Sequence, residues 1–258
     1  MLAGPITPRS EVQILPPLFQ YKLLAQKIFI WDTFSKNMIV AGVDEAGRGP
    51  LIGPLIMAGV SFKENVLNSL KNLGVKDSKL LTQKKREELY KKIIELAENY
   101  KIFIVQPKEI DHFVQSQIFN LNKLEAFYTV KILKILKPDK AYIDCPTHNT
   151  KRYKEYLSSL LGKEFLKHTK IIAENKADYR YIACSAASIL AKVTREREIS
   201  KLKKRYGDFG SGYLTDEKTL KFLKKYYKQY AEIFRKSWVT YQEQLVKQKN
   251  ILEFTNND

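Results

Sequence analysis

Two adjacent carboxylates, Asp44 and Glu45, follow the apolar run 38–43 and precede the glycine-rich stretch Gly47-Arg48-Gly49. Adjacent residues of a regular strand face opposite sides, so both acids can reach one site only where the strand ends or bulges. The two glycines permit such a departure. Taken alone, an acidic pair before glycine also fits a turn or a helix cap.

Two further acids lie at expected element ends. Asp144 closes the short apolar run 141–143, and Asp178 precedes a small-residue helix expected over 181–191. Either acid could be an ordinary helix cap. However, four acids at three element ends in a chain of formal net charge +17 favour a shared site. Clustered carboxylates repel one another unless a cation compensates them, and oxygen ligands suit Mg²⁺ or Mn²⁺.

A basic surface around an acidic cluster has a chemical use, because cations hold phosphates while carboxylates hold metal ions. Two ions about 3.5–4 Å apart can activate water and stabilise the departing oxygen of a phosphodiester. This two-metal site is a nuclease or polymerase design. The sequence has no phosphate-binding Walker loop that would favour an NTPase, and its three histidines argue against a histidine-rich zinc site.

The elements that must position these acids alternate along the chain. Short apolar runs predict strands, and apolar residues at helical spacing, with Lys and Glu opposite, predict helices. The pattern predicts an α/β fold, a mixed sheet flanked by helices. The expected strands are 38–43, 55–60, 102–105, 141–143 and 171–173, and the expected helices are 89–100 and 121–135, the latter stopped by Pro138.

Composition supports a folded domain that binds a polyanion. Of 258 residues, 44% are hydrophobic and 12% aromatic, which is enough for a sizeable core and excludes disorder for most of the chain. The 45 Lys and Arg against 28 Asp and Glu attract either nucleic acid or an anionic membrane. The basic charge is spread along the chain, and no apolar run approaches the ~20 residues of a spanning helix, so we favour nucleic acid.

We divide the chain into three parts. Residues 1–37 form a proline-punctuated N-terminal extension, 38–214 the catalytic domain, and 215–258 basic C-terminal helices and a tail. The chain lacks the pattern of a signal peptide, and its two cysteines, Cys145 and Cys184, suggest free thiols in a reducing compartment. We therefore expect a cytoplasmic protein.

Several separated segments together carry a resemblance to a known family. Residues 42–54 resemble the first motif of ribonuclease HII, the type 2 ribonuclease H. Further similar segments follow in the family's order, at 76–80, 143–144, 175–178, 185–195 and 210–213. The segment 235–238 is similar to archaeal members, and the resemblance covers 38–238.

This resemblance implies a ribonuclease H-like fold and a metal-dependent endonuclease that cuts the RNA strand of RNA/DNA hybrids. It implies that Asp44, Glu45, Asp144 and Asp178 bind Mg²⁺ or Mn²⁺ in a two-metal catalytic site. It also implies cleavage 5′ of single ribonucleotides embedded in duplex DNA, leaving 3′-hydroxyl and 5′-phosphate ends. The expected roles are RNA primer removal and ribonucleotide excision repair.

The family's substrate contacts can be carried over residue by residue. The resemblance implies that the backbone of Gly47, Arg48 and Gly49 contacts the ribose 2′-hydroxyl, and that Tyr213 stacks on the following deoxyribose. Without the resemblance, the glycines fit a tight turn and Tyr213 an ordinary packed aromatic. We expect phosphate contacts from three cations, which could otherwise be merely solvated: Lys79, Lys192 and Arg195.

The C-terminal tail and two rival functions complete the predictions. Gln248, Ile251 and Phe254, within 248–255, resemble a peptide that binds a sliding clamp of the proliferating cell nuclear antigen type, although Thr255 replaces the usual final aromatic. A frayed polar tail is the alternative.

We expect a monomer. The rivals to ribonuclease HII are a related nuclease acting on Holliday junctions or DNA strands, and a non-catalytic hybrid-binding protein.

Overall fold

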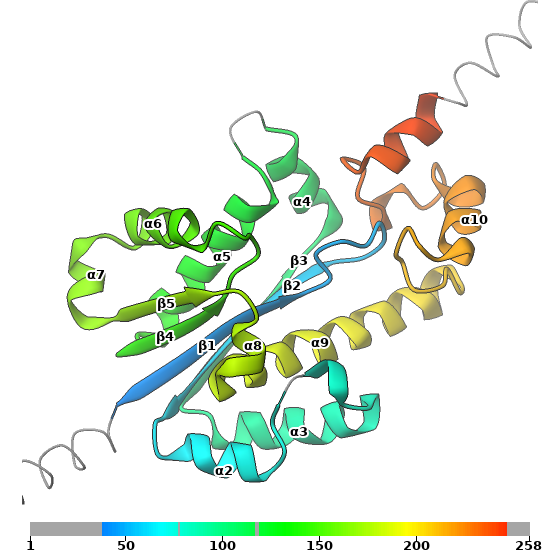
Figure 1. Ribbon diagram of the computed structural model, residues 1–258. Helices are drawn as coiled ribbons and strands as arrows, with labels where there is room; N and C mark the ends of the chain where they lie inside the picture. Colours follow the sequence, from blue (N-terminus) through cyan, green and yellow to red (C-terminus); the bar gives the residue numbers. More distant parts are fainter. Residues whose placement is uncertain (1–37, 77, 117–118, 247–258) are drawn as a thin grey trace, which may run out of the picture. The chain divides into compact units, whose positions relative to one another are not determined.

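A computed structural model describes residues 38–76, 78–116 and 119–246 of the chain. Within them, one mixed sheet of five strands has the order β3-β2-β1-β4-β5 (Figure 1). The strands are β1 (Ile39–Ala46), β2 (Leu55–Lys63), β3 (Asn99–Val105), β4 (Lys140–Asp144) and β5 (Lys170–Glu174). This is the helix-flanked mixed α/β sheet predicted from the sequence.

The central strand β1 joins the antiparallel and parallel halves of the sheet. β1 pairs antiparallel with β2, and β2 with β3, whereas β1–β4 and β4–β5 are parallel pairs. In the β1–β4 register, Val43 lies opposite Ile143. The next residue of each strand is Asp44 and Asp144, so the topology alone brings these two carboxylates to the same edge of the sheet.

Helices cover both faces of the sheet, as Figure 1 shows. One hydrophobic cluster packs α2, α3 and α9 against one face, and a second packs α4, α5 and α6 against the other. The helices on the first face are α2 (Val66–Asn72), α3 (Gln83–Leu96) and α9 (Ile182–Tyr206). Those on the second are α4 (Pro107–Val114), α5 (Leu121–Leu136), α6 (Thr150–Leu161) and α7 (Lys163–His168).

Helix α9 lies unusually close to β1. A Cβ at Gly42 would lie 2.0 Å from the Ala183 carbonyl oxygen, so this position admits only glycine. Alanines and serines dominate the buried N-terminal half of α9, as the predicted small-residue helix required. The thiol of Cys184 donates a hydrogen bond to the Val43 carbonyl at 3.2 Å. Close packing therefore holds α9 directly behind the strand that carries Asp44.

Two expectations need correction. The predicted helix 89–100 ends earlier, because α3 stops at Leu96 and Tyr100 lies in β3, where it pairs with Val60 of β2. The expected end or bulge of the first strand at Asp44 and Glu45 is absent, since pairing with β2 runs without interruption to Ala46. The expected strands at 55–60, 102–105, 141–143 and 171–173 and the helix at 121–135 are confirmed, with bounds extended by a few residues.

The C-terminal region packs on the loop that follows β1. α10 (Glu217–Tyr226) and the 3-10 helix η2 (Ala231–Ile233) contribute to a third hydrophobic cluster, which also contains Leu51 and Ile52. Ile52 forms an isolated β-bridge with Phe234. The region after β5 thus fixes the loop that contains the glycine-rich turn. The predicted boundary between 214 and 215 stays a prediction.

Candidate active site

Three carboxylates from three elements meet at the edge of the sheet where β1 and β4 lie side by side. One oxygen each of Asp44, Asp144 and Asp178 lies within 4.8 Å of the others. Asp44 and Asp144 come from parallel neighbours, whose carboxyl ends share one edge. Asp178 lies in the short helix α8 (Ala177–Arg180), which follows β5. Three of the four predicted acids are therefore brought together.

The segment between β5 and α8, which precedes Asp178, is held by hydrogen bonds to Asp144 and to the loop after β4. The side-chain amide of Asn175 donates to the carbonyls of Cys145 at 2.8 Å and Thr147 at 2.9 Å. The backbone N–H of Ala177 donates to Asp144 Oδ1 at 2.9 Å. Lys176, between them, has a left-handed backbone with φ of 59°. The carboxylates of Asp144 and Asp178 are thus positioned by a shared local network.

Glu45 follows Asp44 in an unbroken strand, and its carboxylate interacts with those of Asp44 and Asp144. Its other charged neighbours are Glu125 on α5 and Arg48. Arg48 donates to the Glu125 carboxylate and, through Nη2, to Asn122 Oδ1 at 2.7 Å. The Arg48 side chain is therefore engaged with α5.

Glu125 is a site residue that the sequence prediction missed. Its carboxylate is only 1% exposed, and its Oε1 has no hydrogen-bond partner among the described residues. A signal existed in the sequence: Glu125 follows Leu124 and lies one turn after Leu121, on the apolar stripe of the helix predicted over 121–135. A carboxylate on a buried stripe requires a partner or a function.

The site is strongly acidic in local potential. Burial raises the pKa of Asp44 well above its usual value, and the charges of Glu45 and Asp144 raise it further. Burial, then Glu125 and Asp144, raise the pKa of Glu45 to about 8. Burial raises the pKa of Glu125 to about 7, against the lowering effect of Arg48. A positive charge close to these carboxylates would stabilise their ionised forms.

The donor set fits a hard divalent cation. Asp44, Asp144 and Asp178 supply only carboxylate oxygens, the ligands that Mg²⁺ and Mn²⁺ prefer. A cation among them would offset the burial and the mutual repulsion that raise the pKa of Asp44 and Glu45. The three aspartates are the residues that would hold such an ion, with Glu45 beside them.

The glycine-rich turn forms one wall of a pocket of about 370 Å³ next to these acids. The pocket is lined by Glu45, Ala46, Gly47, Arg48, Gly49, Lys192, Arg195, Glu196 and Tyr213. Gly47 has φ of +82°, and a Cβ there would lie 2.3 Å from Arg195 Nε, so conformation and space both require glycine. Six predicted substrate residues therefore share this pocket.

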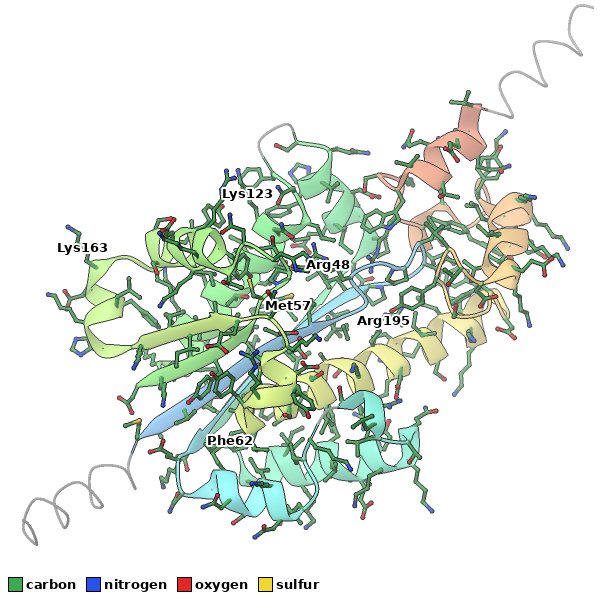
Figure 2. The ribbon with its side chains drawn as sticks, viewed as in Figure 1. Arg48, Met57, Phe62, Lys123, Lys163 and Arg195 are labelled. Carbon is green, nitrogen blue, oxygen red and sulfur yellow. The ribbon has the colours of Figure 1, made fainter. Side chains whose placement is uncertain are left out.

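Arg195 is a pocket cation with buried N–H groups that a ligand could bind. Its Nε and Nη2 atoms are buried, yet neither has a hydrogen-bond partner in the described part of the chain. Its guanidinium lies 5.4 Å from the ring centre of Tyr213. Figure 2 shows Arg48 and Arg195 on opposite sides of the loop after β1. Orphaned guanidinium N–H groups fit an anion such as phosphate.

The other predicted residues have different outcomes. Lys192 donates to the hydroxyl of Ser78, which is 2.8 Å from the Ser188 hydroxyl, so this lysine is bound to the motif at 76–80. Lys79 lies in the 3-10 helix η1 (Ser78–Leu80). Gln248, Ile251 and Phe254 lie outside the described residues.

Two expectations on cysteines and membranes can be compared with the structure. Cys145 and Cys184 are both buried and free, as predicted. None of the described helices combines the length and apolar character that a membrane crossing requires.

Comparisons with known proteins agree with this geometry. The family model for ribonuclease HII matches residues 41–241. A ribonuclease HII from Pyrococcus horikoshii is 47% identical over 208 residues, covering 79% of this chain and 91% of the relative. The crystal structure of ribonuclease H2 from Pyrococcus horikoshii OT3 superposes with a TM-score of 0.72 and 45% identity, over 80% of this chain and 97% of that one.

A second solved structure contains a partner. The PCNA:RNase HII complex from Archaeoglobus fulgidus matches with a TM-score of 0.66 and 40% identity, over 72% of this chain and 86% of that one. The sheet order, the three converging aspartates and the match over 41–241 lead to one conclusion. The chain belongs to the ribonuclease HII family of endonucleases, in its archaeal type.

Proposed function

We propose that this ribonuclease HII cuts the RNA strand of RNA/DNA hybrids, and cuts 5′ of single ribonucleotides in duplex DNA, with divalent metal ions bound at Asp44, Glu45, Asp144 and Asp178. The observation that carries the proposal is the convergence of three aspartates beside a pocket bounded by cations and a glycine turn. Bound Mg²⁺ or Mn²⁺ would supply an activated water and neutralise the departing oxygen.

Different residues of this chain hold the metal ions and bind the phosphates of the substrate. The aspartates orient oxygen ligands from three rigid elements, which keeps their spacing fixed. Arg195, with its orphaned N–H groups, binds a backbone phosphate, and Lys192 adds positive charge on the same wall. Lys79 supplies a further phosphate contact from the neighbouring motif. The overall charge of +17 holds the duplex against this face.

The Gly47-Arg48-Gly49 turn and Tyr213 recognise the ribose. The backbone amides of Gly47, Arg48 and Gly49 bind the 2′-hydroxyl, the one group that distinguishes RNA from DNA at the sugar. Tyr213, 40% exposed, lines the same pocket and stacks on the deoxyribose that follows. The product ends are a 3′-hydroxyl and a 5′-phosphate.

The decisive experiment is a cleavage assay on duplex DNA with one embedded ribonucleotide, run with Mg²⁺, with Mn²⁺ and with a chelator. Wild type should cut this duplex with either metal, and should cut neither an all-DNA duplex nor any substrate with chelator. Asp144→Asn should reduce cleavage by about 10³-fold and keep hybrid binding, because it removes a metal ligand charge and no packing.

Asp139→Asn is the matched control, since Asp139 lies at the opposite end of β4 and its carboxylate accepts from the Ile39 N–H at 2.7 Å. Its activity should stay within about twofold of wild type. Cleavage of all-DNA duplexes or four-way junctions would support the related-nuclease rival. Hybrid binding by wild type without cleavage in either metal would support the non-catalytic rival.

A partner can also be proposed. We infer that residues 248–255 bind a PCNA-type sliding clamp, with Gln248, Ile251 and Phe254 as anchors. Support comes from the sequence pattern and from the Archaeoglobus fulgidus relative, whose structure is a complex with PCNA. Ile251→Ala with Phe254→Ala should abolish co-elution with archaeal PCNA and leave cleavage of free duplex unchanged. Co-elution that survives both substitutions would place the contact elsewhere.

A further inference from the structure

Arg235 is a fully buried cation whose hydrogen bonds all end on one loop. Its side chain is 0% exposed, and it donates to the carbonyls of Gly47, Arg48 at 2.7 Å and Gly53 at 3.1 Å. Burying a guanidinium is costly unless its N–H groups are satisfied. Here main-chain carbonyls accept from each of the three guanidinium nitrogens, so the position of Arg235 and the shape of the 47–53 loop depend on each other.

Trp238 extends this contact by one residue. Its indole N–H donates to the Gly49 carbonyl at 3.2 Å, and the Arg235 guanidinium lies 4.9 Å from the centre of its ring. Arg235 and Trp238 therefore bind three consecutive carbonyls, those of Gly47, Arg48 and Gly49. We call this pair of side chains the carbonyl brace.

The carbonyl brace determines where the amides of the turn point. In a trans peptide the N–H of each residue is antiparallel to the preceding C=O, and the described residues contain no cis peptide. With the Gly47 and Arg48 carbonyls directed at Arg235, the N–H groups of Arg48 and Gly49 are directed away from it. Among the described residues, these two N–H groups have no protein acceptor.

The segment that carries the brace is itself anchored independently of the turn. Asp111, a buried residue of α4, accepts from the backbone N–H groups of Lys236 at 2.9 Å and Ser237 at 2.8 Å, and from the Ser237 hydroxyl at 2.6 Å. The Arg235 N–H donates to the Leu51 carbonyl at 2.9 Å. Hydrogen bonds to α4 and to Leu51 therefore hold the segment that carries the brace, and the turn that the brace contacts lines the pocket.

We propose that Arg235 and Trp238 are positioning residues for ribose recognition: by holding the carbonyls of the Gly47-Arg48-Gly49 turn, they aim its free amides at the 2′-hydroxyl. This inference rests on the proposed function of the turn. It assigns the C-terminal region a part in substrate discrimination, in addition to its packing. A purely structural role predicts equal losses for every duplex, whereas positioning predicts a selective loss for ribose.

The test measures that selectivity directly. All variants are made in an Asp144→Asn background, so that duplexes are bound and not cut, and affinities are measured with Mg²⁺ by fluorescence anisotropy. The readout is the ribose preference, defined as Kd for an all-DNA duplex divided by Kd for the same duplex with one ribonucleotide. Thermal melting of each variant reports folding.

Trp238→Phe keeps an aromatic ring and removes one N–H donor, so we expect the ribose preference to fall by about fivefold, the value of one hydrogen bond. Arg235→Lys keeps the charge but cannot serve all three carbonyl contacts, and we expect a fall of about tenfold or more. For both, affinity for all-DNA duplex should stay within about twofold. Lys236→Ala, the matched control, removes a neighbouring exposed charge and should leave the preference unchanged.

The outcomes separate the proposed function of the turn from the positioning role of Arg235 and Trp238. If the parent Asp144→Asn protein shows no ribose preference, the proposed function of the turn fails before the carbonyl brace is tested. If the parent shows a preference that Trp238→Phe and Arg235→Lys both retain, the positioning role is wrong. If Arg235→Lys fails to fold, Trp238→Phe alone decides, because its loss is confined to one hydrogen bond near the surface.

Discussion

At the scale of single residues, the site depends on two adjacent acids of β1. Asp44 groups with Asp144 and Asp178, while Glu45 interacts with Asp44 and Asp144 and also with Glu125 and Arg48. The two acids stand next to each other in an unbroken strand, because β1 continues to Ala46 without a bulge. Glu45 thus connects the three aspartates with a second buried acid, Glu125.

The raised pKa of Glu45 has a measurable consequence for stability without metal. The folded protein keeps this proton up to about pH 8, whereas the unfolded chain loses it near pH 4.5. Between these values the folded state binds more protons, so its unfolding free energy falls as pH rises. Glu45→Gln should therefore melt higher than wild type at pH 9 in chelator, by roughly 4–8 °C for a gain of about 2 kcal/mol, and equally at pH 4.

The matched control is Glu155→Gln, which changes an exposed glutamate of α6. It should follow wild type at both pH values. Saturating Mg²⁺ should raise the wild-type melting temperature at pH 9 and do so less for Glu45→Gln, because the cation relieves the same repulsion. A Glu45→Gln protein that melts with wild type in chelator at pH 9 would contradict the electrostatic origin of the effect.

At the scale of elements, the geometry of the candidate site depends on how closely α9 approaches β1. The backbone of Ala183 occupies the space that a side chain at Gly42 would need. This approach places Ser188 of α9 where it bonds the Asp44 carboxylate. It also places Lys192 and Arg195, one and two turns further along, beside the glycine turn. Gly42 in the sheet thus allows α9 to place Lys192 and Arg195 in the pocket.

Gly42→Ala should separate α9 from β1. A Cβ 2.0 Å from a backbone oxygen cannot be accommodated by side-chain movement, so we expect a loss of at least about 3 kcal/mol, lowering the melting temperature by roughly 6–12 °C. Gly74→Ala is the control, because a Cβ there meets no atom within 4 Å and adds only the strain of φ +88°, about 1 kcal/mol. Equal losses for the two variants would show that the α9 contact is not tight.

At the scale of the whole molecule, global and local charge have opposite signs. The chain carries +17, yet its candidate site concentrates five buried or partly buried carboxylates: Asp44, Glu45, Glu125, Asp144 and Asp178. In the proposed function, the positive net charge attracts the duplex and the buried acids hold the cations, so substrate and cofactor are drawn to adjacent places by opposite charges.

This separation predicts that affinity and selectivity respond differently to salt. Raising monovalent salt from about 50 to 200 mM should weaken duplex binding by an order of magnitude or more, because lysines and arginines release counterions. The ribose preference should stay constant, because it depends on hydrogen bonds in a partly enclosed pocket. Anisotropy titrations in the Asp144→Asn background measure both quantities. A preference that falls in parallel with affinity would show that charge carries the selectivity.

Particular residues show how far sequence reasoning reached and where it stopped. Asp44 and Asp144 could be predicted because each follows a local apolar run, and Asp178 because it precedes a small-residue helix. Arg48 was predicted by its motif, but its side chain pairs with Glu125, 77 positions away. Arg235 was noted only as part of an archaeal-type segment, since nothing local shows that it binds carbonyls near residue 47.

The sequence by itself determined the family, the mixed sheet and the acids of the site, because strand and helix patterns and motif residues are local properties of the chain. Only the tertiary structure decided that the buried Glu125 lies near Glu45, and that Arg235 and Trp238 hold the turn. Those facts depend on contacts between distant segments, which local patterns do not encode.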